Sequence, residues 1–124
     1  MDSAERRLGA DLRPFTDADG RYDAAKIAAA LDWEQREIAR FLGRDPSSVS
    51  KNPSALSYQQ QLARLVSLFN RIVELSGNDV GAAVAWLRTP IWALDNQSPK
   101  TLLLTEQTSI VERLVREYDS ALAG

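Results

Sequence analysis

Apolar positions recur along this chain with the spacing of amphipathic helices. Residues 58–75 place apolar side chains at intervals of three and four, and residues 106–122 repeat the pattern, which predicts two long helices with one buried face each. The apolar positions are Leu62, Leu65, Val66, Phe69, Ile72 and Val73 in the first helix, and Ile110, Val111, Leu114, Val115, Tyr118 and Leu122 in the second. The first stripe is expected to form core, with a dimer seam as the alternative.

Two shorter helices are predicted upstream, over residues 23–31 and 33–42. Asp23, the first residue of one helix, and Asp32, just before the other, are expected to be their N-caps, because a carboxylate accepts hydrogen bonds from the free N–H groups of a first helical turn. Gln35 would add a partial capping box to the second helix. Residues 1–22 are polar and mixed in charge, and they predict a tail and a turn, with one helical turn at residues 4–12.

A short third helix is predicted over residues 46–51. Gly43 suits the left-handed position that ends the preceding helix, Asp45 is a cap, and Pro46 fits the first helical position. Val49 would anchor this helix to the core. The succession of a helix, a turn that contains glycine, and a second helix is typical of a helix-turn-helix unit.

The exposed face of that unit offers hydroxyl, amide and cationic groups for phosphate and base-edge contacts. The candidate DNA-binding residues are Arg36, Arg44, Ser47, Ser48, Lys51 and Asn52. Between residues 33 and 52, however, four basic residues stand against three acidic ones. This balance gives a weak electrostatic footprint for DNA, so a packing or dimer module remains an equal alternative.

The second half of the chain predicts a short helix at residues 80–87, capped by Asn78 or Asp79, and then a connection interrupted by prolines. Val84 and Leu87 are expected to face inward in that helix, and Trp92 and Leu94 to pin the connection. Ser98 would cap a helical segment that begins at Pro99, and Thr105 would cap the last helix.

Residues 86–104 contain tryptophan, leucine and proline residues in a recognisable order. A Trp-Leu pair is followed by proline, leucine, proline and a Leu-Leu pair, at Trp86, Leu87, Pro90, Leu94, Pro99, Leu102 and Leu103. This order resembles the toxin-binding domain of Xre/MbcA/ParS-type antitoxins, and the resemblance continues through Val111, Leu114 and Val115. The family often has Asn where this chain has Ile91, and Gly at positions where this chain has residues 96–98 and 108–109.

The resemblance implies an antitoxin that binds a RES-domain toxin, an NAD-consuming protein, by direct contact. It also implies a homodimer and repression of the antitoxin's own promoter through the helix-turn-helix unit. The candidate toxin-binding residues are Arg88, Trp92, Lys100, Arg113, Arg116 and Tyr118. A further hypothesis is that the last helix and its small tail obstruct the NAD cleft of the toxin.

Composition narrows the alternatives. The chain has 124 residues, no Cys, no His and three Lys, so disulfides, thiolate metal sites and the commonest general base are excluded. We predict no enzyme, no catalytic or metal site and no cofactor. A net charge of −2 predicts no general attraction to nucleic acid. No apolar run is long enough to span a bilayer and no leader is visible, so a cytoplasmic protein is expected.

The expected architecture is all-α. It comprises the tail at 1–22, a helix-turn-helix unit at 23–57, and a C-terminal helical toxin-binding domain at 58–124 that begins with the long central helix. The leading function is that of an antitoxin. The alternative is a helix-turn-helix transcription regulator without a toxin partner, or a small adaptor.

Overall fold

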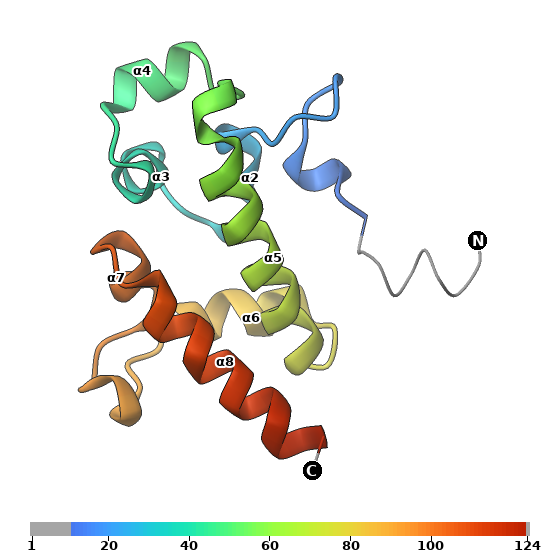
Figure 1. The fold of residues 1–124 in the computed structure, drawn as a ribbon, viewed down its shortest axis with the longest axis vertical. Helices are drawn as coiled ribbons and strands as arrows, with labels where there is room; N and C mark the ends of the chain where they lie inside the picture. Colours follow the sequence, from blue (N-terminus) through green and yellow to red (C-terminus); the bar gives the residue numbers. More distant parts are fainter. Residues whose placement is uncertain (1–10, 124) are drawn as a thin grey trace. The chain divides into compact units, whose positions relative to one another are not determined.

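The computed structural model describes residues 11–123, and in that range it is all-α, as the sequence predicts (Figure 1). Its helices are η1 (Arg13–Phe15), α2 (Ala24–Leu31), α3 (Gln35–Leu42), α4 (Pro46–Lys51), η2 (Leu56–Tyr58), α5 (Gln59–Leu75), α6 (Val80–Leu87), η3 (Trp92–Leu94), α7 (Pro99–Leu104) and α8 (Thr108–Ala123), where η marks a 3-10 turn. The described residues divide into two compact units, residues 11–66 and 67–123. The predicted domain limits at 22/23 and 57/58 stay a prediction.

The first unit is built on α2, which packs against η1 and α3, while α3 packs against α4. Asp23 caps α2 as predicted, because its carboxylate accepts the N–H of Lys26 at 3.0 Å. Gln59 ties the segment before α2 to the start of α5, since its amide bonds the backbone N–H and C=O of Tyr22 at 2.8 and 2.9 Å. The core side chains are Phe15, Ile27, Leu31, Trp33, Ile38, Phe41, Leu42, Val49, Tyr58, Leu62, Leu65 and Val66.

Residues 11–22 of the predicted tail and turn are held against the first unit. Phe15 is buried, and Thr16 and Tyr22 form an isolated antiparallel bridge around the turn. Lys26 holds the same segment, because its ammonium donates to the carbonyl oxygen of Thr16 at 2.6 Å. The helical turn predicted at residues 4–12 lies outside the described residues, apart from 11 and 12, which form no helix.

The predicted start of α3 is wrong by two residues. Asp32 does not cap α3: it adopts a left-handed conformation with φ 58° and ends α2. Glu34 is the N-cap instead, and it forms a reciprocal capping box with Glu37 in which Gln35 has no part. Burial of Trp33 explains the shift, because its indole packs edge-on against Phe41 at 6.2 Å and so fixes residues 32–34 outside the helix.

The second unit contains the end of α5 and helices α6 to α8, with α7 packed against both α6 and α8. Asp79 caps α6 and Ser98 caps α7, as predicted. Val84 is only half-buried, and Ala83 takes the inward position with Leu87. The core side chains are Leu68, Phe69, Ile72, Ala83, Leu87, Leu94, Leu102, Leu103, Val111, Leu114 and Val115.

The last helix also begins two residues later than predicted. Thr105 does not cap it, because its hydroxyl donates to the carbonyl oxygen of Thr101 in the preceding helix at 2.8 Å. Glu106 has φ 62°, in the left-handed region, and makes the turn between α7 and α8. The physical cause is that residues 105–107 must close α7 before a new helical direction can start.

None of the helices within residues 11–123 combines the length and apolar character needed to cross a bilayer.

Candidate functional site

Helices α3 and α4 form the predicted helix-turn-helix succession, joined by residues 43–45. Gly43 takes φ 68° and ends α3, and Val49 buries α4 in the core of the first unit. Asp45 caps α4 by accepting the backbone N–H of Ser47 at 3.1 Å. Its carboxylate also accepts the Ser47 hydroxyl, and this hydrogen bond holds the pKa of Asp45 below its usual range. The cap is therefore ionised at neutral pH.

The predicted DNA-binding side chains are all exposed, but their charges are not equally available. Arg36 is paired with Glu34, its Nε lying 3.2 Å from a carboxylate oxygen. Arg44 lies over the ring of Tyr58, with 5.6 Å between the guanidinium carbon and the ring centroid. Within residues 11–123, Lys51 has no such partner. Lys51 is therefore the most available cation among the candidate DNA-binding residues.

The connection between α6 and α7 is a braced loop rather than a free linker. Ile91 and Gln97 form an isolated antiparallel bridge, with the N–H of Ile91 donating to the carbonyl oxygen of Gln97 at 3.1 Å. Asp95 and Asn96, with φ 56° and 62°, reverse the chain between them. Leu94 is buried and anchors the loop as predicted.

Trp92 does not pin this loop, contrary to the sequence prediction. Its side chain is 86% exposed, the highest exposure among the large apolar residues described. The reason is local geometry: η3 directs Leu94 into the core, and Trp92, at its first residue, projects to solvent. A rigid loop thus carries an indole that makes no ring contact within the described part of the chain.

The remaining predicted toxin-binding residues are spread over α6 to α8. Arg88 follows α6 and is exposed, and Lys100 lies in α7 and is half-buried. Arg113 and Arg116 are exposed on α8, and no ion pair involves either within residues 11–123. Tyr118 is 40% exposed, and its ring is not free: it packs edge-on against Trp86, with centroids 6.2 Å apart.

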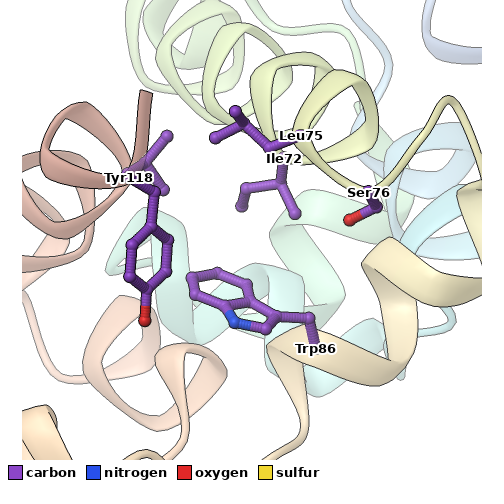
Figure 2. Close-up of a pocket in the computed structure, with 6 residues that line it drawn as sticks. Ile72, Leu75, Ser76, Trp86 and Tyr118 are labelled. Atoms are coloured by element: carbon purple, nitrogen blue, oxygen red, sulfur yellow. The ribbon is translucent and has the colours of Figure 1, made fainter. Parts of the chain in front are cut away.

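A hollow that the sequence does not predict lies within the second unit, where the end of α5 meets α6 and α8. Its volume is about 240 Å³. Figure 2 shows the rings of Trp86 and Tyr118 on one side, with Ile72 and Leu75 above them. The residues that line it are Ile72, Leu75, Ser76, Trp86, Val115 and Tyr118. The apolar stripes of α5 and α8 were the available signal, but stripes alone do not show where packing is incomplete.

Two carboxylates and one guanidinium come from positions next in sequence to residues that line this hollow. Arg71 bonds Glu74 on its own helix, with 2.9 Å between Nη1 and Oε2, and also bonds Asp119 on α8. These three side chains are each partly exposed. Among residues 11–123, no cluster of three or more acidic side chains is placed to hold a metal ion.

Comparison with known proteins bears on the second unit. Residues 68–120 match the model of the family described as the antitoxin Xre/MbcA/ParS C-terminal toxin-binding domain. A curated relative named Antitoxin Xre, from Yersinia enterocolitica, is 43% identical over 47 residues, which are 38% of this chain and 32% of the relative. The chain therefore aligns with about a third of that relative's length. No solved structure matches the chain.

Proposed function

We propose that the protein is the antitoxin of a toxin–antitoxin pair, because residues 68–120 match the family of C-terminal toxin-binding domains of Xre/MbcA/ParS antitoxins. It acts by binding, without catalysis. The observation that carries the proposal is the position of Trp92 within the matched segment: an indole 86% exposed on a braced loop. A protein partner would explain why so large an apolar side chain is held in solvent.

The proposed partner is a RES-domain toxin, as the family resemblance implies. The contact surface consists of the α6–α7 loop and the outer face of α8, and its proposed members are Arg88, Trp92, Lys100, Arg113, Arg116 and Tyr118. All six lie inside the segment that matches the family. Tryptophan, tyrosine and arginine are the residue types that dominate binding energy at protein interfaces, which supports this choice.

A second role is proposed for the first unit, namely repression of the operon by a homodimer of the antitoxin. The support is structural: α3 and α4 are joined by a three-residue turn, and the exposed face of α4 carries Ser47, Ser48, Lys51 and Asn52. The competing proposal, a transcription regulator without a toxin, rests on the same face and assigns no role to Trp92.

The experiment that tests the function is expression of the neighbouring reading frame alone and together with this chain. We expect growth arrest in the first case, rescue in the second, and a stable complex by affinity purification and size-exclusion chromatography. Rescue without a complex would contradict neutralisation by contact. Absence of both toxicity and complex would favour the transcription regulator, and a DNA-binding selection would then test it.

A further inference from the structure

The hollow in the second unit has the size and chemistry of a receptor for one side chain. Its volume of about 240 Å³ lies below the roughly 300–1,000 Å³ typical of pockets for small molecules. The walls combine aliphatic groups from α5 and α8 with the indole of Trp86 and the phenol ring of Tyr118. One branched aliphatic, methionine or phenylalanine side chain would fit into such a space and cover part of its walls.

The walls are held in place before any partner arrives. Trp86 and Tyr118 fix each other by edge-on contact, and Val115, which also lines the hollow, is buried. Arg71 bridges Glu74 and Asp119, which ties α5 to α8 beside the hollow. A preformed pocket lowers the ordering cost of binding, so it gives more affinity than a flexible apolar surface of equal area.

The net negative charge beside the hollow would favour a positively charged residue next to the inserted apolar side chain. One guanidinium faces two carboxylates, which leaves one negative charge when Arg71, Glu74 and Asp119 are summed. The last turn of α5, which contributes Leu75, contains no Lys or Arg to offset the negative end of the helix dipole, whereas at α6 the C-cap residue is Arg88. A cation close to the apolar anchor, on the side of α5, would be stabilised by the net negative charge and by the end of that helix.

We infer that this hollow is a second docking point for the proposed toxin, which inserts one apolar side chain flanked by a Lys or Arg between α5, α6 and α8. The inference rests on the proposed function and deepens it, because it adds a receptor pocket to the projecting indole of Trp92. The toxin is then held in two ways: Trp92 enters the toxin, and a toxin side chain enters the antitoxin. Leu122, which is 73% exposed, lies one helical turn beyond Tyr118 on the same face of α8 and offers further apolar surface to the partner.

The test fills the hollow without removing any part of the core. Ser76 lines the pocket, is half-buried, and makes no side-chain hydrogen bond within residues 11–123. Ser76→Met places a thioether in the space for the partner's side chain. Ser67→Met is the matched control, because Ser67 is an exposed serine on the same helix α5 and lines no part of the hollow. Thermal melts followed by circular dichroism verify that both variants fold.

The probe is the purified product of the neighbouring reading frame, whose affinity is measured by calorimetry. We expect Ser76→Met to raise the Kd about 30-fold or more, as for loss of an interface hot spot, and Ser67→Met to change it less than twofold. Glu74→Gln should weaken binding about threefold at low salt and flatten its salt dependence. In a nitrogen-15 NMR titration, the indole N–H resonance of Trp86 should shift on binding.

Each alternative outcome overturns the inference in a recognisable way. If the wild-type protein binds the toxin, Ser76→Met binds it equally well and the Trp86 resonance does not shift, then the pocket is not part of the toxin interface. The proposed function is unaffected by that result. If Ser76→Met instead alters the oligomeric state of the free chain while toxin affinity is retained, the hollow receives a second copy of this chain. No binding by the wild-type protein contradicts the proposed function and the inference together.

Discussion

Truncation of Trp92 separates binding from folding more cleanly than any other single change in this chain. A buried tryptophan side chain removes about 150–250 Å² from water, and Trp92 leaves most of that area exposed. At about 25 cal/mol per Å², covering roughly 200 Å² in a complex gives about 5 kcal/mol as an upper bound. Measured interface truncations give about 2–4 kcal/mol, which corresponds to a Kd raised about 30- to 1,000-fold.

The stability of the free protein should hardly respond to the same change. A side chain 86% exposed contributes little to folding, so Trp92→Ala should alter the free energy of unfolding by less than about 0.5 kcal/mol. Leu94→Ala, two positions along the same loop, removes a side chain that is only 7% exposed and should cost about 2–5 kcal/mol. The pair distinguishes a contact residue from one that supports the loop.

The assay is calorimetric titration of each variant with the product of the neighbouring reading frame, together with chemical denaturation of the free chain. Val80→Ala is a control for loss of exposed apolar area, since Val80 is 52% exposed at the start of α6 in the same unit. Its Kd should stay within twofold of wild type. A Trp92→Ala protein that binds within threefold of wild type would refute the role assigned to the indole.

Three further outcomes are expected. Glu106→Gly should raise the free energy of unfolding by about 0.5–1 kcal/mol and the melting temperature by a few degrees, because glycine adopts φ 62° without the strain of a Cβ. Thr105→Gly is the control and should lower both quantities, because φ −119° suits any residue and glycine only adds freedom to the unfolded chain. Asp45→Ala should lower the melting temperature at neutral pH. The pKa of Asp45 is depressed by Ser47 when the chain is folded, so its contribution is present above its ordinary value of 3.8 and disappears as pH falls through the folded pKa; melts of the variant and wild type should therefore converge in acid. Lys51→Glu should weaken operator binding at least tenfold and reduce its salt slope by about 1, measured by fluorescence anisotropy, while the affinity for the toxin stays unchanged.

The features predicted correctly from the sequence are those governed by neighbouring residues. Asp23, Asp45, Asp79 and Ser98 cap the helices that follow them, because a side-chain oxygen and the free N–H it accepts lie within three positions. Gly43 ends α3 for a similarly local reason. The apolar stripes likewise locate α5 and α8 and most of their buried faces, and the order of anchors around the two prolines indicates the family.

The two errors in helix starts arise where side-chain packing or a chain reversal outweighs the local preference for a cap. Trp33 enters the core against Phe41 and so moves the start of α3 from Asp32 to Glu34. A left-handed Glu106 closes α7, although no residue near it signals a positive φ.

The same division holds for the candidate sites. The sequence alone determined that Trp92 sits in an apolar connection between two prolines, and it marked the residue as a contact candidate. The sequence also predicted that both Leu94 and Trp92 would pin the loop. Only tertiary structure decided that Leu94 does so alone and leaves Trp92 in solvent, in a loop that the bridge between Ile91 and Gln97 orients. The hollow beside Trp86 and Tyr118 exists because three helices of the second unit pack without filling the space between them, and no local pattern encodes that space.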